Sequence, residues 1–429
     1  MSATETRPDA VAQTLELLDD LFDGYRRDFV VRLWDGTTRG PDRGEEARFA
    51  LALNHEGALR TILASPSRLQ LSFAEAYLHG DLDIEGDLEA VFPLADWLLI
   101  DRRWDRREQL QLLRRARALP ANGRTPTGRG PARLRGRRDS ADRLAQAVHY
   151  HYDLDPEFYG VFLDRRLVYT CAYFRGPDDD LDTAQEQKLD YICRKLRLQP
   201  GERLFDIGCG WGALVMHAAE HYGVEALGAT LSAPQAELAN ERIGAAGLAD
   251  RCRVEVRDFR EVAGEFDKVS SIGMFEHLTE GALPEYFAHV YEVLRPGGAF
   301  LNHGIGEPAT VRARRGGSFT MAYIFPDCEL LPISTTLREA EAAGFEVRDV
   351  ESLREHYALT VSAWRSRLEA GRDRAVAATD ELTYRVWRLG MAGFTYGQRV
   401  GRLNLWQALL VKPADGSSGL PLTREDWYA

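Results

Sequence analysis

The stretch that decides the fold is Leu204-Phe205-Asp206-Ile207-Gly208-Cys209-Gly210-Trp211-Gly212. An apolar strand ends in an acid and a run of alternate glycines that opens a helix, so backbone can approach a ligand closely at the carboxyl edge of a sheet. Around it, apolar strand-like runs alternate with helical periods over Arg203–Ile207, 212–222, Ala226–Thr230, 232–246, Cys252–Val256, Lys268–Ile272, 281–295 and Ala299–His303. This alternation predicts an α/β fold, a Rossmann-like doubly wound sheet wrapped by helices.

The glycine spacing indicates which cofactor the loop binds. It reads G-x-G-x-G directly after Asp206, whereas a dinucleotide loop reads G-x-G-x-x-G and has its acid about 20 residues further on. At that later place the chain has Gly228-Ala229-Thr230-Leu231-Ser232, without a carboxylate. Because a carboxylate attracts a cationic sulfonium and repels a pyrophosphate, Asp206 favours S-adenosylmethionine and hence a class I methyltransferase. The alternative is a structural turn with an accidental acid.

Length and composition limit the classes of protein. The chain has 429 residues, a formal net charge of −12 and five cysteines. Single cores stop growing at roughly 250–300 residues, so two domains are expected. The acidic total argues against a nucleic-acid partner, and five cysteines without a C-x-x-C pair argue against a disulfide framework and a metal site. Without a signal segment or roughly 18–20 uninterrupted apolar residues, we expect a cytoplasmic protein that touches a membrane from one side, the inner face.

The expected domain boundary is a segment of nine arginines, three prolines and four glycines between Arg114 and Arg138, without an acidic residue. Such a composition cannot bury apolar surface and predicts a flexible linker over 113–141. It would join an N-terminal membrane-docking domain, 1–112, to a catalytic domain, 142–429. The linker is either a solvated spacer or a polybasic strip for anionic lipid headgroups, at about 1 kcal/mol per residue near the surface.

The part before the linker reads as a smaller α+β domain. Strand patterns cover 28–36 and Phe49–Leu53, and helical patterns cover 56–63, 71–78 and 88–100. No obvious catalytic cluster lies in this region. The chemistry is therefore expected after the linker.

Seven short motifs occur in order along the chain: His149–Leu154, Tyr169–Phe174, the glycine loop, Thr230–Gln235, Gly273–His277, His356–Thr360 and Leu405–Gln407. A fainter one is Ala74–Tyr77. Together they resemble the cyclopropane-fatty-acyl-phospholipid synthases and the related mycolic-acid cyclopropane synthases, which use S-adenosylmethionine. The resemblance covers nearly the whole chain.

The resemblance implies eight residues that bind S-adenosylmethionine. Three would hold its amino-acid end, two would close over it, two would take the ribose, and the last would lie near the adenine. In that order they are Asp206, Gly208, Gly210, Tyr169, Thr170, Thr230, Gln235 and Asp258.

The implied reaction methylates an isolated double bond in an acyl chain of a membrane phospholipid, such as an oleoyl chain. An isolated alkene is a poor nucleophile, so the reaction demands a strong electrophile in a dry, aligned site and leaves a carbocation. In the family, a bound bicarbonate ion removes a proton from this cation. The matching residues here are Cys171 and Ile305, through backbone groups, and Glu276, His303 and Tyr357, through side chains.

The roles of these residues follow from the same resemblance. His303 would donate to the anion, and Glu276 would accept from the bicarbonate hydroxyl and so orient it. No part of the chemistry needs a covalent thiol at Cys171. Aromatic rings suit a cation because their quadrupole stabilises positive charge without acting as a base, although ordinary core packing is the alternative. The aromatic candidates are Tyr173, Phe174, Phe275, Tyr323 and Phe325.

Two products can form from one cation, a cyclopropane or a methylene-branched chain. Asn302 and Gly304 depart from the common family pattern around His303. With the long N-terminal part, they look more like the branch that makes methylene-branched chains, of the 10-methylenestearoyl type. A small-molecule methyltransferase and a non-catalytic lipid-binding relative stay as alternatives. Family resemblance also makes a homodimer possible.

Overall fold

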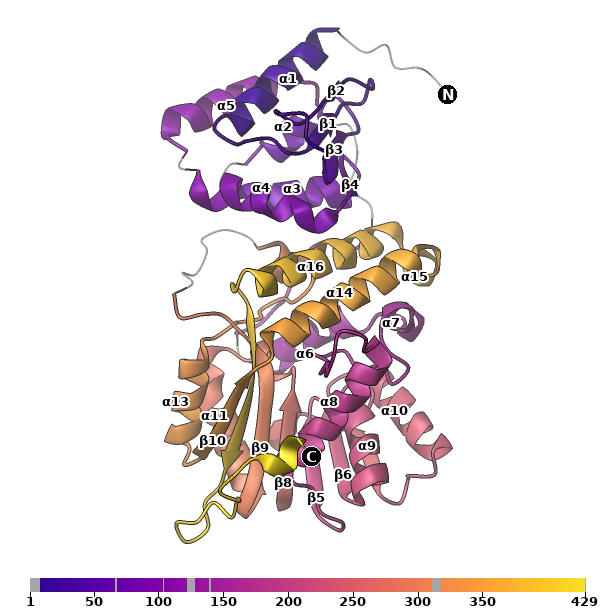
Figure 1. The fold of residues 1–429 in the computed structure, drawn as a ribbon, viewed down its shortest axis with the longest axis vertical. Coiled ribbons are helices and arrows are strands. Elements are labelled where there is room, and N and C mark those ends of the chain that lie inside the picture. The colour runs from indigo at the N-terminus through magenta and orange to yellow at the C-terminus, as the bar shows by residue number, and fades with distance from the viewer. Residues whose placement is uncertain are drawn as a thin grey trace. The chain divides into compact units, whose positions relative to one another are not determined.

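A seven-stranded sheet forms the centre of the larger part of the computed structural model, which describes residues 8–65, 68–102, 104–121, 128–138, 140–310 and 318–428 (Figure 1). The strand order is β10-β11-β9-β8-β5-β6-β7, and β11 alone runs antiparallel to its neighbours. The predicted doubly wound, Rossmann-like α/β fold is therefore confirmed. The strands are β5 (Arg203–Ile207), β6 (Glu225–Thr230), β7 (Cys252–Val256), β8 (Phe266–Ile272), β9 (Leu294–Gly306), β10 (Glu346–Ser352) and β11 (Asn404–Val411).

Helices cover both faces of this sheet because neighbouring residues of a strand point to opposite sides. On β5, Leu204 joins the core under one helical layer, and Phe205 joins the core under the other. The first layer is α8 (Leu181–Leu196), α9 (Ala213–Tyr222) and α10 (Ala233–Ala245), and the second is α11 (Leu283–Val293) and α13 (Ile333–Ala342). The chain order reverses at β5, which lies between β6 and β8, so a ligand site is expected at its carboxyl end.

Further helices of the same unit complete it. They are α6 (Ala141–Tyr152), α7 (Pro156–Phe162), α14 (Arg354–Ala370), α15 (Arg372–Ala378), α17 (Glu425–Tyr428), and the 3₁₀ turns η4 (Phe259–Glu261), η5 (Phe275–His277) and η6 (Glu280–Ala282). Of these, α6 contributes side chains to the pocket at the carboxyl edge of the sheet.

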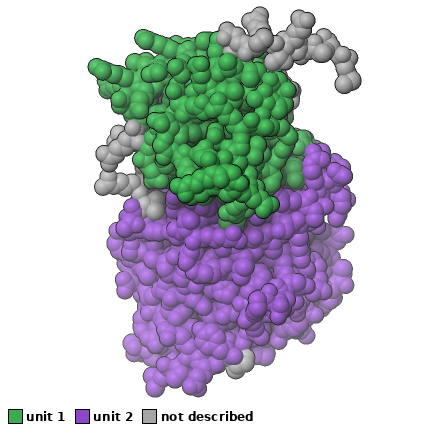
Figure 2. Space-filling view, turned by 45° about the horizontal axis from the view of Figure 1, so that its top comes forward, with its two compact units in different colours: residues 1–131, 314–324, 380–393 green, residues 132–313, 325–379, 394–429 purple. Residues whose placement is uncertain are grey.

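The chain divides into two compact units, which Figure 2 colours separately. The larger unit comprises 132–313, 325–379 and 394–429. The smaller unit comprises 1–131, 314–324 and 380–393, so it includes α12 (Phe319–Tyr323) and the first part of α16 (Glu381–Arg399). Two segments from within the predicted catalytic domain, 142–429, thus belong to the smaller unit, which the prediction of consecutive domains did not include.

The smaller unit has the predicted α+β composition. Its sheet has the order β2-β1-β3-β4, in which only β1 and β3 pair in parallel. The elements are α1 (Pro8–Phe22), β1 (Val30–Arg32), β2 (Thr38–Arg39), β3 (Phe49–Leu53), α2 (Ala58–Ile62), α3 (Leu69–Leu78), β4 (Leu82–Gly86), the 3₁₀ turn η2 (Leu88–Val91), α4 (Phe92–Asp96), the π-turn η3 (Trp97–Asp101) and α5 (Arg106–Ala118).

Two predicted elements of this unit are shorter than expected. The strand expected over 28–36 ends at Arg32, because the Leu33 amide donates to the Thr37 carbonyl at 2.8 Å and closes a turn. The helix expected over 88–100 is divided into three pieces. Pro93, which lacks a backbone N–H, lies in the first turn of α4, where a proline can only begin a helix.

The arginine-rich segment begins as a helix, so the prediction of irregular chain from residue 113 is wrong there. Helix α5 continues to Ala118, and an Asp105–Glu108 capping box stabilises its start. Arg115 forms an ion pair with Asp20 of α1, whereas Arg124 lies outside the described residues. The arginines at the end of this helix are exposed, while Leu112 and Ala116 are buried. Composition counts only residue types, so it could not show that the arginines form the outer side of a helix.

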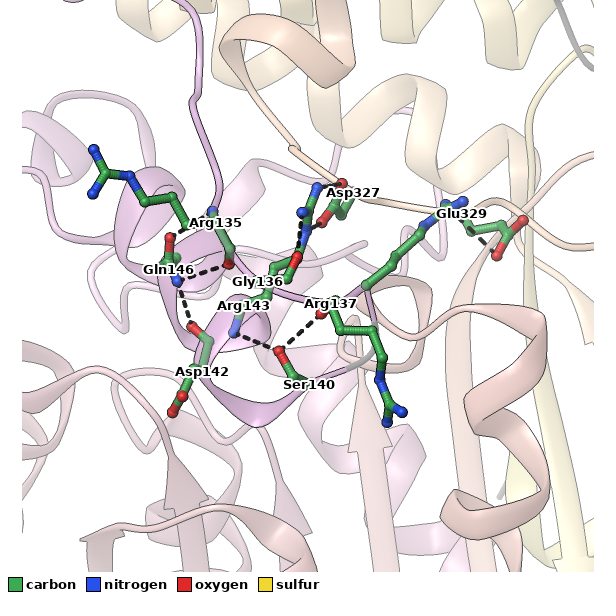
Figure 3. Close-up of polar contacts among 10 residues, drawn as sticks. Arg135, Gly136, Arg137, Ser140, Asp142, Arg143, Gln146, Asp327 and Glu329 are labelled. Atoms are coloured by element: carbon green, nitrogen blue, oxygen red, sulfur yellow. Dashed lines mark hydrogen bonds and ion pairs between the residues drawn. The ribbon is translucent and has the colours of Figure 1, made fainter.

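The end of the same segment belongs to the larger unit and is bonded to residues of α6 there (Figure 3). The side-chain amide of Gln146 bonds both backbone groups of Arg135, at 3.0 and 3.2 Å, and Arg143 donates to the Gly136 carbonyl at 2.9 Å. Arg143 also pairs with Asp327. The composition predicts a free spacer, but the backbone of this part is hydrogen-bonded. Its partners are on α6, outside the segment, so the composition of the segment does not reveal them.

The arginine side chains themselves remain at the surface of this part. Arg133, Arg135, Arg137 and Arg138 are exposed, and Arg138 lies 3.8 Å from Glu329.

No helix among the described residues is long and apolar enough to cross a bilayer.

Candidate functional site

The glycine loop turns tightly over the end of β5 onto the neighbouring strand. The backbone amides of Gly208 and Cys209 both donate to the Ala229 carbonyl, at 2.9 and 3.0 Å. Gly208 has a φ of +73°, and a Cβ there would lie 2.8 Å from the Cβ of Met274. A side chain at this position would therefore strain the backbone and collide with the segment that follows β8.

A pocket opens beside this loop at the carboxyl edge of the sheet, where a chain reversal predicts one. All eight residues that the sequence predicts for the cofactor line it: Tyr169, Thr170, Asp206, Gly208, Gly210, Thr230, Gln235 and Asp258. Its other walls include Leu144, Val148 and Tyr152 of α6 and His277; Tyr152 and His277 belong to motifs quoted from the sequence but were given no role there. The fold thus brings together residues that are almost 90 positions apart in the chain.

Asp206 is a buried carboxylate in the wall of the pocket. Its carboxylate accepts from the Ser270 hydroxyl at 2.7 Å, and burial raises the pKa of Asp206 to about 7 despite that bond and the nearby Lys188. The Lys188 ammonium donates to Thr170 at 2.9 Å, and burial lowers the pKa of Lys188 to about 8. A cationic amino group beside Asp206 would favour its ionised form, so the buried acid suits the amino-acid end of S-adenosylmethionine.

Two polar pairs follow at the ends of β6 and β7. Thr230 donates its hydroxyl to Gln235 Oε1 at 2.8 Å, which leaves the Gln235 amide nitrogen to donate to a ligand. Burial favours a higher pKa for Asp258, but the Arg260 side chain and backbone lower the pKa below its ordinary value. Asp258 also caps η4 through the Arg260 amide. It is therefore an ionised acceptor at the pocket wall.

The second predicted set adjoins this pocket. Glu276 lies on η5 directly after β8, His303 and Ile305 lie on β9, and the Gly273 amide donates to the His303 carbonyl at 2.8 Å. A Cβ at Gly304 would lie 2.8 Å from Glu276 Oε2 and closer still to the Phe275 ring. A side chain at position 304 would therefore collide with Phe275 and Glu276, and glycine there leaves room for Glu276 beside β9.

Glu276 and His303 are buried, and each has one polar atom without a partner among the described residues. These atoms are Glu276 Oε2 and His303 Nε2. Burial raises the pKa of Glu276 to about 7, although the backbone amides of Glu276 and Ile305 act against it. Burial and the nearby Lys188 and Lys195 hold the pKa of His303 well below its ordinary value, so its imidazole is neutral. Because buried polar groups are normally paired, these two atoms fit a small polar ligand such as bicarbonate.

Tyr357 and Cys171 complete this set from two other segments. Burial raises the pKa of Tyr357 well above its ordinary range, and Tyr169, Cys171 and Glu276 add to the effect electrostatically. Cys171 is fully buried, and burial raises the pKa of its thiol. The thiolate that a nucleophile needs is therefore disfavoured.

An aromatic cluster adjoins the pocket, which three of its members, Tyr152, Tyr169 and His277, also line. Its rings are in contact over centroid distances of 4.1 to 6.2 Å, and its members include His151, Tyr152, Tyr169, His277, Phe325 and Trp364. Burial lowers the pKa of His277 to about 4, so this ring is neutral. The motif His149–Leu154 contained the signal for two of these residues.

The five aromatic candidates are distributed more widely than expected. Phe325 belongs to the cluster, and Phe275 packs in the core against Gly304. Tyr173 stacks on His356 at 4.7 Å, and the Phe174 amide donates to the same histidine. Tyr323 lies in the smaller unit, where its hydroxyl donates to Glu75.

The fold and the site together define a class I S-adenosylmethionine-dependent methyltransferase. A family comparison goes further: the model of the mycolic acid cyclopropane synthetase family matches residues 139–408, and the chain belongs to that family. A domain of unknown function matches residues 16–95. The protein is thus a methyltransferase of the family of fatty acid methyltransferases and cyclopropane synthases, with S-adenosylmethionine as co-substrate.

Relatives of nearly the same length carry related names. A probable fatty acid methyltransferase of Pseudomonas putida is 39% identical over 93% of this chain and 95% of its own. One of Mycobacterium tuberculosis is 37% identical over 91% and 92%. The crystal structure of the mycolic acid cyclopropane synthase CmaA1 complexed with SAH and CTAB is 33% identical, with a TM-score of 0.59, and covers 62% of this chain and 97% of that one.

Proposed function

We propose that the protein methylates the double bond of unsaturated acyl chains, such as oleoyl, in membrane phospholipids. When bound, S-adenosylmethionine supplies an electrophilic methyl group, whose carbon bonds to one alkene carbon as its bond to sulfur breaks. The alkene electrons form the new bond, and the other alkene carbon is left as a carbocation. The aromatic cluster supports this proposal, because its rings stabilise a cation without removing a proton and keep water away.

The observation that carries the proposal is that two buried atoms beside the cofactor pocket, Glu276 Oε2 and His303 Nε2, have no partner in the described part of the chain. We propose that they hold bicarbonate together with the Tyr357 side chain and the backbone of Cys171 and Ile305. When bound, bicarbonate supplies a base that is not readily alkylated. Neutral His303 would donate to the anion, ionised Glu276 would accept from its hydroxyl group, and the Tyr357 hydroxyl would add a further donor.

The proposed product is a methylene-branched chain. A hydride moves from the methylated carbon to the cationic carbon, and a proton then leaves the new methyl group to form an exocyclic double bond. The departure of Asn302 and Gly304 from the common family pattern around His303 supports this choice. The second candidate is a cyclopropane, which forms if the proton leaves while the ring closes from the first cation.

Access to a double bond inside a bilayer needs contact with the membrane. We propose that the protein works at the inner face of the cell membrane, as a peripheral protein and as a homodimer. The exposed arginines between Arg133 and Arg138 support contact with anionic headgroups, because each adds about 1 kcal/mol near a charged surface. The smaller unit is the other proposed docking part.

One incubation tests the reaction and its product. The enzyme is mixed with vesicles of dioleoyl phospholipid and S-adenosylmethionine carrying a CD₃ group, and the chains are analysed by mass spectrometry before and after ozonolysis. The methylene product is cleaved to a ketone and loses its label, whereas a cyclopropane resists and keeps it. Turnover of a soluble substrate without any labelled acyl chain would refute the proposal in favour of a small-molecule methyltransferase.

A further inference from the structure

A buried hydrogen-bonded chain leads from helix α8 to the site histidine. It consists of Lys195 on α8, Gln407 on β11 and His303 on β9, and each is at most 1% exposed. Gln407 lies directly opposite His303 in the antiparallel register of β11 and β9. The pairing of the two strands therefore sets the amide against the imidazole.

The orientation of the Gln407 amide follows from its first neighbour. Lys195 Nζ lies 2.9 Å from Gln407 Oε1. An ammonium group can only donate, so the amide atom that faces it must be the oxygen. The amide nitrogen, Nε2, then faces His303 Nδ1 at 2.9 Å and must donate to it.

The same chain of donors decides which nitrogen of His303 carries the proton. A neutral imidazole has one N–H and one lone pair, and Nδ1 uses its lone pair to accept from Gln407. The proton is then on Nε2, the atom that has no partner among the described residues. His303 thus presents a donor, and not a lone pair, at the site.

Lys195 is itself held in place by acids on β10. Its ammonium pairs with Glu351 and lies 3.7 Å from Asp349, and Tyr191 donates to Glu351 at 3.0 Å. These contacts hold the Lys195 ammonium in place against Gln407 Oε1.

We propose that Gln407 is a positioning residue that, with Lys195, selects the Nε2–H tautomer of His303, so that the histidine binds an anion. This inference deepens the proposed function and rests on it only for the identity of the anion as bicarbonate. Gln407 touches neither the cofactor pocket nor the partnerless Glu276 atom, so it acts through His303 alone.

The test replaces the amide by an acid. In Gln407→Glu a carboxylate oxygen can still accept from Lys195, while the other accepts from His303 Nδ1–H, so the tautomer inverts and a lone pair faces the anion. Gln407→Met removes the donor without adding a charge. The matched control is Asn302→Asp, an amide-to-acid change at the neighbouring buried residue of β9, which pairs with the Tyr286 hydroxyl and not with His303.

The first readout is independent of turnover. Nitrogen-15 NMR of histidine-labelled protein, with His303 assigned by a His303→Asn variant, is expected to show a protonated Nε2 and an unprotonated Nδ1 in the wild type and in Asn302→Asp. Gln407→Glu is expected to reverse the pattern, and Gln407→Met to show a mixture. A protonated Nδ1 in the wild type, or no change in Gln407→Glu, overturns the inference.

The second readout separates the proposed role of Gln407 from the proposed function of the site. With circular dichroism unchanged, Gln407→Glu is expected to raise the KM for bicarbonate about 10- to 100-fold, the worth of a hydrogen bond to a charged group, and to leave the Kd for S-adenosylmethionine unchanged. If the wild type is active without bicarbonate, bicarbonate is not the base. The tautomer of His303 is then still decided by the NMR result. An unchanged KM with an inverted tautomer overturns the role of Gln407 in anion binding.

Discussion

Replacing Glu276 with Gln is expected to stabilise the protein at alkaline pH while it removes the proposed anion site. Glu276 is buried, and burial raises its pKa to about 7 from an ordinary value of 4.5. Between these two values the unfolded chain has released its proton and the folded protein has kept it. Folding stability therefore falls as pH rises from about 4.5 to about 7, and it stays reduced above that.

The magnitude follows from the size of the shift. A difference of about 2.5 pKa units, at 1.36 kcal/mol each, corresponds to about 3 kcal/mol of stability lost when Glu276 is ionised. A glutamine keeps the shape and has no charge to bury. Relative to the wild type, Glu276→Gln is expected to gain about 3 kcal/mol at pH 8 and less than about 1 kcal/mol at pH 5.

Urea unfolding at pH 5 and pH 8 measures this difference, followed by a signal from the larger unit such as tryptophan fluorescence. Glu241→Gln, on the exposed surface of α10, is the control for the loss of one negative charge. Asp206 also has a raised pKa, but its contribution is common to variant and wild type. An equal stability difference at both pH values would refute the assignment of a buried carboxylate with a raised pKa.

Three further predictions concern the cofactor loop, the buried thiol and the basic strip. Gly208→Ala is expected to weaken S-adenosylmethionine binding at least 10-fold by calorimetry, because its Cβ would meet Met274 at 2.8 Å, whereas Gly244→Ala, with open space around it, is expected to bind normally. Cys171→Ser is expected to keep its activity in the acyl methylation assay, and complete loss in a folded variant would show that the thiol takes part. The last prediction replaces Arg133, Arg135, Arg137 and Arg138 with Gln. This variant is expected to sediment less with anionic vesicles at low salt and to keep the same Kd for the cofactor. Equal vesicle binding would exclude the strip as a docking element.

The cofactor half of the site could be read from the sequence because its signal is local. A strand, an acid and alternate glycines follow one another within nine residues, and parallel strands bring the residues after β6 and β7 to the same edge. The resemblance to a family extended this to the other cofactor residues and to Glu276 and His303. Trp364 was missed, and His151 and Tyr152 were quoted in a motif without a role, because aromatic residues in helices are also typical of ordinary cores.

The course of the arginine-rich segment could not be read in the same way. Composition indicates that a segment lacks a core of its own, but its backbone partners, Gln146 and Arg143, are on a helix that follows it. Likewise, the segments 314–324 and 380–393 join the N-terminal unit through contacts that span more than 200 residues, such as Tyr323 with Glu75. Patterns within a short window contain no information on such contacts.

By itself, the sequence determined the α/β fold and the class of cofactor, because periodicity and glycine spacing act over a few residues. The residues around the cofactor were implied by the resemblance to a family. Only the tertiary structure decided how those residues behave. Burial sets the pKa of Glu276 near 7, and the pairing of β11 with β9 places Gln407 against His303. Both effects depend on groups brought close by folding, since desolvation and hydrogen-bond donors act through space and not along the chain.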